Sequence, residues 1–185
     1  NAVCNAGKSK ANLLKNNPLG YFIASMVAGI FIAFGGMVMC TAGGSLDGLQ
    51  AAKLVASIVF AAALSLVVMA GAELFTGNNM VMAAASLNKT VKWGETIKVW
   101  VVCYLGNWVG SLLAAFLFHL TKATAAGTAV GTYMANITVT KMNTDVLTLF
   151  VKAIFCNILV CLAVWCCTKM KSESGKLIMI LWCIL

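Results

Sequence analysis

Charged side chains are scarce in this chain. Only 10% of its 185 residues are Asp, Glu, Lys or Arg, whereas soluble domains carry about 25%. Hydrophobic residues make up 62% of the chain, and its mean hydropathy is +0.95. Segments of about ten residues with alternating hydrophobicity are absent, which argues against an outer-membrane barrel. The sequence therefore predicts an integral membrane protein built of helices.

Arginine is absent, and histidine occurs once, at His119. The thirteen lysines give a net charge of +8, but they are scattered, so nucleic acid is not expected as a partner. One histidine excludes a bis-histidine haem or a histidine-rich zinc site within the chain. The eight cysteines form no C-x-x-C pair, and Cys156, Cys161 and Cys166 rotate around a helix and cannot converge on one metal. We expect no cofactor and no metal.

One apolar segment, from 49 to 88, is nearly twice as long as the roughly 20 residues that a membrane-spanning helix needs. Its middle, residues 71–79, holds a carboxylate, two glycines, a hydroxyl and two amides. Unpaired polar groups cost several kcal/mol each in lipid. The segment is either two helices joined by a turn, or one crossing made of two half-helices around an irregular loop. Irregular backbone at membrane depth survives only where it lines a cavity or lies inside protein, so the second alternative predicts a pore.

The lysines favour the single broken crossing. Candidate spans cover about 19–40, 51–88 (broken), 97–120 and 147–168, and a fifth begins near 177. With one crossing in the broken segment, nine lysines share a side of the membrane: Lys8, Lys10, Lys15, Lys89, Lys92, Lys98, Lys169, Lys171 and Lys176. Four lie on or near the other side: Lys53, Lys122, Lys141 and Lys152. This bias fits the positive-inside rule with a cytoplasmic N-terminus, and two crossings would remove it.

Small residues predict close helix packing between the first and third spans. Gly106 and Gly110 lie four residues apart on the third span, and Ser25, Gly29 and Ala33 have the same spacing on the first. The stretch 121–145 is rich in Thr, Ala and Gly with few large apolar residues, which predicts an extracytoplasmic loop.

Two segments place unusual polar residues inside apolar helix. Residues 68–77 are Val-Met-Ala-Gly-Ala-Glu-Leu-Phe-Thr-Gly, and residues 153–163 are Ala-Ile-Phe-Cys-Asn-Ile-Leu-Val-Cys-Leu-Ala, with Asn157 a lone amide. Together they resemble both signature segments of the formate/nitrite transporter family, and the resemblance extends from about residue 17 to residue 185. The form Glu-Leu-Phe-Thr-Gly-Asn-Asn is most similar to the branch that contains the bacterial hydrosulfide channel.

The resemblance implies an all-α, aquaporin-like membrane fold with six spans in two inverted repeats, of which the second and fifth are broken. It also implies a homopentamer in lipid, in the bacterial inner (cell) membrane, with a pore in each protomer. On this basis residues 1–185 form a single channel domain, incomplete at the C-terminus, that covers spans one to four and the start of the fifth. The family carries a pore histidine at the fifth-helix break, and His119 is not that residue.

The resemblance places an apolar constriction at Phe60, Leu64, Leu74 and Phe75, and Val160 in the second signature segment is counted with them. The helix break is assigned to Gly71, Glu73, Gly77 and Asn78. Lys141 matches the vestibule lysine of the family and would attract anions; Lys152 is a second candidate, with a snorkelling interfacial lysine as the alternative.

The residues themselves also favour an anion path. A half-helix beginning near Thr76–Asn79 would direct its N-terminal amides into the bundle, which favours negative charge. Thr76 and Asn157 offer a hydroxyl and an amide that can replace water around a small anion. Glu73 would repel such an anion, so we expect it to accept hydrogen bonds from loop amides instead of contacting the permeating ion.

The predicted function is a channel or transporter for small monovalent anions: hydrosulfide, formate or nitrite. An aquaporin-like channel for neutral solutes is the main alternative because it shares the fold. Its two Asn-Pro-Ala motifs are missing, and Pro18 is the only proline. A membrane-embedded thiol enzyme would need converging cysteines or several histidines, which the chain lacks.

Overall fold

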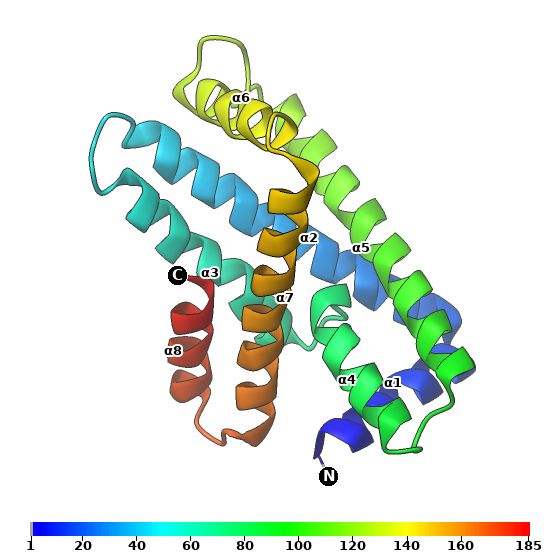
Figure 1. Ribbon diagram of the computed structural model, residues 1–185. Helices are drawn as coiled ribbons and strands as arrows, with labels where there is room; N and C mark the ends of the chain where they lie inside the picture. Colours follow the sequence, from blue (N-terminus) through cyan, green and yellow to red (C-terminus); the bar gives the residue numbers. More distant parts are fainter. Residues whose placement is uncertain (1) are drawn as a thin grey trace.

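The computed structural model describes residues 2–185, which form eight helices and no strand (Figure 1). In chain order the helices are α1 (Ala2–Asn16), α2 (Pro18–Ser45), α3 (Ala52–Ala70), α4 (Phe75–Leu87), α5 (Trp93–Leu120), α6 (Ala129–Met142), α7 (Val146–Lys169) and α8 (Glu173–Ile184). Four of them, α2, α3, α5 and α7, are long and apolar enough to cross a membrane. The all-helical membrane fold predicted from composition is confirmed.

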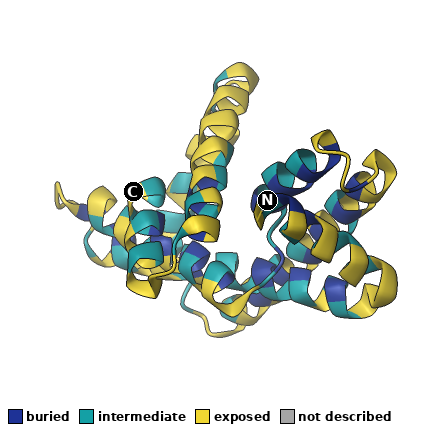
Figure 2. Ribbon diagram, turned by 90° about the horizontal axis from the view of Figure 1, so that it is seen from below, coloured by how far each residue is buried: buried dark blue, intermediate teal, exposed yellow. Residues whose placement is uncertain are grey.

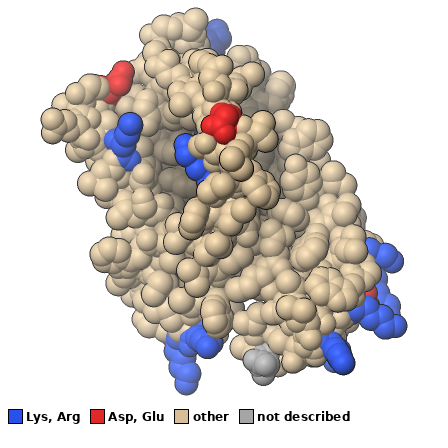
Figure 3. All heavy atoms as spheres, viewed as in Figure 1, with Lys and Arg blue, Asp and Glu red and all other residues tan. Residues whose placement is uncertain are grey.

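Residues 49–88 cross the bundle once. In Figure 1, α3 descends from the upper left to the centre, and α4 continues from the centre to the lower edge. The α4–α5 and α7–α8 connections both lie at that lower edge, whereas α6 and the α2–α3 connection lie at the upper end. The broken crossing is therefore confirmed. In Figure 3, lysine side chains gather along the lower edge, further lysine and acidic side chains lie over the upper part, and the band between the two is uncharged.

The helix starts follow from capping side chains. Asn17 Oδ1 accepts from Gly20 N at 2.9 Å, and Pro18 takes the first position of α2, where its missing N–H costs nothing. Asp145 accepts from Thr148 N at the start of α7, and Ser172 accepts from Gly175 N at the start of α8. These caps set where the chain turns at the membrane surface.

The predicted contact between the first and third spans forms between α2 and α5. Gly29 faces the backbone carbonyl of Asn107, and Gly110 faces that of Met26, so closely that a methyl group at either glycine would collide with the carbonyl. Gly106 lies against Ser25. Close backbone approach through small residues is how helices associate in lipid, where apolar surface alone gives little attraction.

Two buried apolar clusters lie on either side of the broken crossing. The first joins α2, α3, α7 and α8 through Ala28, Leu64, Val67, Val160, Ala163, Cys167 and Ile180. The second joins α2, α4 and α5 through Tyr21, Met82, Ala85, Val91, Val99 and Cys103. Exposed residues cover much of the remaining helix surface, as Figure 2 shows. The break thus lies between two packed cores.

Two parts of the structure differ from the sequence-based expectation. The prediction of a loop over 121–145 is wrong for residues 129–142, which form α6. Thr128 caps this helix by accepting from Gly131 N at 3.0 Å, and Gly43 and Gly44 of α2 leave room for Tyr133 and the Ala129 backbone. The polar N-terminal segment, for which no element was expected, forms α1.

The topology predicts where attached labels report. Tags at Lys92 and at Ser172 should be accessible from the same side of the membrane, and a tag near Gly127 from the opposite side. The reason is that one crossing, α5, lies between Lys92 and Gly127, and one crossing, α7, lies between Gly127 and Ser172. Labelling of each site in intact vesicles with a membrane-impermeant reagent measures this. Lys92 and Ser172 on opposite sides would contradict a single crossing by residues 49–88.

Candidate functional site

The break between α3 and α4 is short and its backbone is well defined. Gly71 ends α3 in the left-handed conformation, with φ +71°, which favours glycine. Ala72 N still donates to Val67 O at 3.0 Å, and Leu74 is extended before α4 starts at Phe75. The half-helix therefore begins one residue before the start predicted from the sequence.

Asn107 of α5 holds both sides of the break. Its Oδ1 accepts from Phe75 N at 2.9 Å, and its Nδ2 donates to Glu73 O at 2.8 Å and to Ser25 O at 2.7 Å. Glu73 N donates to Ala24 O of α2 at 3.2 Å. One amide side chain thus joins α2, the break and α5. Buried backbone groups need such partners, since water is excluded from the hydrocarbon region.

The Glu73 carboxylate is bound by side chains and not by loop amides, so the expectation for its partners is wrong. Lys10 Nζ lies 2.7 Å from both of its oxygens, and Oε2 also accepts from Tyr21 Oη at 3.1 Å and from Asn78 Nδ2 at 2.9 Å. The cause is the close approach of α1, α2 and α4, which brings these donors within reach. Sequence analysis missed Lys10. The sequence did indicate that some cation should lie near Glu73, because a buried carboxylate needs one. No local spacing, however, indicates which lysine supplies it.

The first turn of α4 carries amides that point to the break. Phe75 N donates to Asn107, and Asn78 N donates to Leu74 O. Within residues 2–185, the N–H groups of Thr76 and Gly77 have no hydrogen-bond partner. Free amides at a helix N-terminus carry partial positive charge, which favours an anion.

Three of the predicted constriction residues meet in the first apolar cluster. Leu64 and Val160 are buried, with 2% and 9% of their surface exposed, and Leu74 packs against the same cluster. Val67, one turn after Leu64, joins them, and sequence analysis missed it. Its position three residues after Leu64, on one helix face, was the available signal. Phe60 is half-buried one turn before Leu64.

Phe75 lies apart from that cluster. Its ring packs edge-to-face on Tyr104 of α5, with the centroids 5.3 Å apart and the planes at 71°. It also packs against the second cluster. Leu74 and Phe75, neighbours in the chain, therefore contact opposite cores.

Thr76 and Asn157 are brought near each other by the contact of α4 with α7. Cys161 Sγ lies 3.3 Å from Thr76 O and 3.3 Å from Asn157 Oδ1. Both residues are half-buried. Gly77 is buried, and a Cβ there would lie 3.2 Å from the side chain of Val164 on α7. The two polar residues predicted for the anion path thus lie at the same level as the α4 N-terminus.

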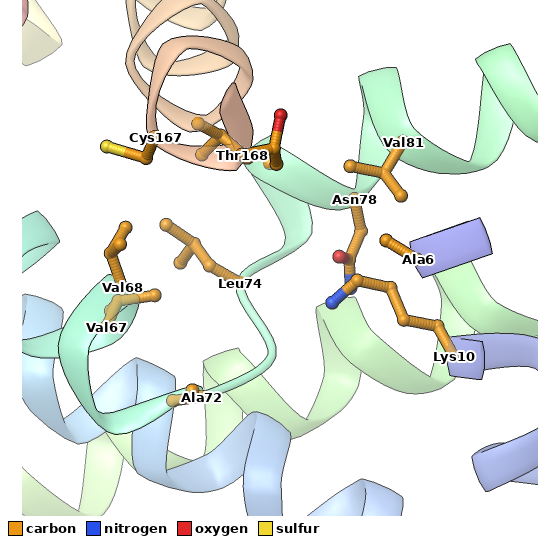
Figure 4. A pocket seen from close by; sticks show the side chains of 13 residues that line it. Ala6, Lys10, Val67, Val68, Ala72, Leu74, Asn78, Val81, Cys167 and Thr168 are labelled. Atoms are coloured by element: carbon orange, nitrogen blue, oxygen red, sulfur yellow. The ribbon is translucent and has the colours of Figure 1, made fainter. Parts of the chain in front are cut away.

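A cavity of about 250 Å³ lies below this level, on the side of α1 (Figure 4). It is an open cavity, lined by α1, the end of α3, the break, α4 and the end of α7. Its lining residues are Ala6, Lys10, Val67, Val68, Gly71, Ala72, Leu74, Gly77, Asn78, Val81, Val164, Cys167 and Thr168.

Lys141 and Lys152 lie at the other end of the bundle. Lys141 is in the last turn of α6 and Lys152 in the second turn of α7, and both are exposed. Neither lines the cavity or forms an ion pair with another residue of the described chain. Their attraction of anions stays a prediction.

A multi-pass helical fold with one crossing interrupted at mid-depth, and an irregular backbone held inside the protein, is the fold of a membrane channel or transporter. The chain belongs to the formate/nitrite transporter family, whose model matches residues 1–185.

Named relatives and solved structures agree with this membership. The chain is 33% identical over 175 residues to the nitrite transporter NirC of Escherichia coli, an alignment that covers 95% of this chain and 64% of that protein. The match thus spans somewhat under two thirds of the length of that relative. An FNT family ion channel superposes with a TM-score of 0.91 at 31% identity, over 98% of this chain and 72% of the other. A pentameric formate channel with formate bound superposes with a TM-score of 0.79 at 26% identity, over 92% and 69%.

Replacing Asn107 with Leu should destabilise the protein by about 2 kcal/mol or more, because it leaves Phe75 N without a partner and Glu73 O with only the weak thiol donor of Cys103. Thermal unfolding in detergent measures the effect. Asn136, an exposed amide on α6, provides the control, and its replacement with Leu should change stability little. Equal unfolding temperatures for the two variants would show that Asn107 does not hold the break.

Proposed function

We propose that the protein conducts small monovalent anions across the bacterial inner membrane, through a pore in each protomer of a homopentamer. In this proposal residues 1–185 are one channel domain, and the lysine-rich side, with α1, faces the cytoplasm. The relatives are transporters and channels and not enzymes, and two of them are named for nitrite and formate. Hydrosulfide, formate and nitrite are the substrates we propose for this chain.

The proposal rests on the N-terminal end of α4, which lies inside the bundle. Its free Thr76 and Gly77 amides, the Thr76 hydroxyl and the Asn157 amide together offer donors to an ion that has lost its water. The apolar cluster of Leu64, Leu74 and Val160 lies next to these donors. A bare anion is strongly disfavoured between apolar side chains, so the combination limits passage to small, singly charged ions.

The remaining predicted residues take supporting roles in this proposal. Phe60 extends the apolar wall by one turn, and Phe75 fixes the start of α4 through its contact with Tyr104. Gly71 lets the chain turn at the end of α3, and Gly77, which has no side chain, leaves room for α7 to pack closely. Lys141 and Lys152 raise the local concentration of anions at the opposite mouth, an effect that salt screens over about 8–10 Å.

A channel for neutral solutes is less well supported. The Thr76 and Gly77 amides can only donate, and the Asn157 side-chain oxygen already accepts from Cys161 Sγ, so the site offers more donors than acceptors and favours an anion over a neutral solute, which needs both. The Asn-Pro-Ala motifs of aquaporins are also missing from the sequence.

Flux measurements in proteoliposomes test the proposal. Thr76→Val should reduce formate flux by about tenfold, because it removes a donor worth about 1.4 kcal/mol to an anion while it keeps the shape. Leu64→Ala should instead raise flux or admit the larger anion lactate, because it widens the apolar cluster.

Matched controls are available at exposed positions of other parts of the bundle. Thr41→Val, at an exposed threonine of α2, and Leu66→Ala, at an exposed leucine of α3, should both transport like the parent. If Thr76→Val and Leu64→Ala also match the parent for both anions, the anion path does not pass the break.

A further inference from the structure

Another cavity lies on the lysine-rich side of the bundle, between the end of α1 and the start of α5. Its volume is about 310 Å³, and its lining residues are Ala11, Leu14, Lys15, Glu95 and Lys98. Pockets for small ligands span about 300–1,000 Å³. This cavity shares no lining residue with the cavity beside the break. Because its two lysines come from different helices, the packing of α1 on α5 brings two positive charges to one place.

The cavity is built on the packed core. Ala11 and Leu14 are partly buried and pack against the second apolar cluster, which fixes the last turns of α1. Lys15 follows Leu14 in the last turn of α1, and Lys98 precedes the fully buried Val99 of α5; both lysines are exposed. The cavity therefore combines an apolar wall, held in place by the core, with charged groups that a ligand can reach.

Neither lysine is neutralised by a carboxylate. Within residues 2–185, the only ion pair within 4 Å is that of Lys10 with Glu73. Glu95, the acidic residue of this cavity, accepts from Lys92 N at 3.1 Å through Oε2. It lies in the first turn of α5, where the positive end of the helix dipole offsets its charge. An anion that enters the cavity thus meets two ammonium groups that have no acidic partner.

The protein surface next to the cavity is apolar. On α5, Val101 and Leu105 lie three and seven residues after Lys98, on the same helix face, and are 52% and 45% exposed. On α2, which begins directly after α1, Leu19 and Ile23 are also exposed. A ligand with an anionic group in the cavity could therefore lay hydrocarbon chains along both helices.

We propose that this cavity binds the phosphate group of an anionic phospholipid such as phosphatidylglycerol. Lys15 and Lys98 donate to the phosphate oxygens, and the acyl chains lie along the exposed apolar residues of α2 and α5. Basic pockets between helices at the lysine-rich face of a membrane protein recognise anionic headgroups in this way. Trp93, half exposed in the first turn of α5, is of a residue type that is enriched at the headgroup level. The site is independent of the proposed anion path, because a lipid reaches it from the membrane.

The test titrates the full chain in detergent with phosphatidylglycerol or with phosphatidylcholine, whose headgroup has no net charge. Native mass spectrometry counts the bound lipid. We expect phosphatidylglycerol to bind about tenfold more tightly than phosphatidylcholine. The double variant Lys15→Gln/Lys98→Gln should lose about tenfold or more of the affinity for phosphatidylglycerol, because each lysine adds to the attraction of the headgroup. Added salt should reduce the difference between the variant and the parent.

The matched control is Lys8→Gln/Lys171→Gln, which removes the same charge from exposed positions on the same side of the bundle, outside the cavity. It should bind phosphatidylglycerol like the parent. Thermal unfolding provides a second measurement. Phosphatidylglycerol should raise the unfolding temperature of the parent and of the control more than that of the double variant, because a ligand that binds the native state stabilises it.

Equal affinities of the double variant and the control for phosphatidylglycerol would overturn the inference, as would a parent that binds both lipids equally. Inorganic phosphate that displaces phosphatidylglycerol at equal concentration would show a site for free phosphate and would overturn the assignment to lipid. A parent that binds neither lipid would show that the cavity is closed in the assembled protein, which also contradicts the proposal. None of these outcomes depends on anion flux, so the proposed function is tested separately.

Discussion

The hydrogen bonds of Asn107 to the interrupted backbone are the interaction on which the rest of the site depends. A helix broken in mid-membrane exposes amide and carbonyl groups that lipid cannot satisfy. Asn107 binds Phe75 N and Glu73 O, and it also ties them to Ser25 O on α2. The glycines on either side of it let α2 and α5 approach closely enough for these bonds. Because the break is held from α5, the first turn of α4 keeps free amides beside α7.

The charge at the break is also balanced by only a few side-chain contacts. Glu73 follows the turn of the chain, and its carboxylate collects Lys10, Tyr21 and Asn78 from three different helices. The carboxylate is therefore a junction that joins α1 and α2 to α4. The apolar cluster of Leu64, Leu74 and Val160 lies on the other side of the crossing. Donors for an anion and apolar bulk that excludes water thus meet at one level of the bundle.

Some of this could be predicted from the sequence and some could not. The length of 49–88, its polar middle and the lysine bias together predict one broken crossing, because each follows from membrane thickness and local composition. Lys10 and Asn107 could not be found in this way. Their partners Glu73 and Phe75 lie 63 and 32 residues away, and such pairs leave no local periodicity. Helix α6 was missed because the threonines, alanines and glycines of residues 121–145 suggest a loop, whereas packing on Gly43 and Gly44 stabilises a helix.

In the proposed channel the break lies on a solvent-accessible path that attracts anions. Ala72 lines the cavity at the break, whereas Met69 is exposed on the outer surface of α3. The most direct test introduces Ala72→Cys, or Met69→Cys as control, into a background without the native cysteines, and compares labelling by anionic and cationic methanethiosulfonates. We expect the anionic reagent to label Ala72→Cys faster than the cationic reagent does, and excess formate to slow this labelling. Labelling no faster than that of Met69→Cys, or faster with the cationic reagent, would contradict it.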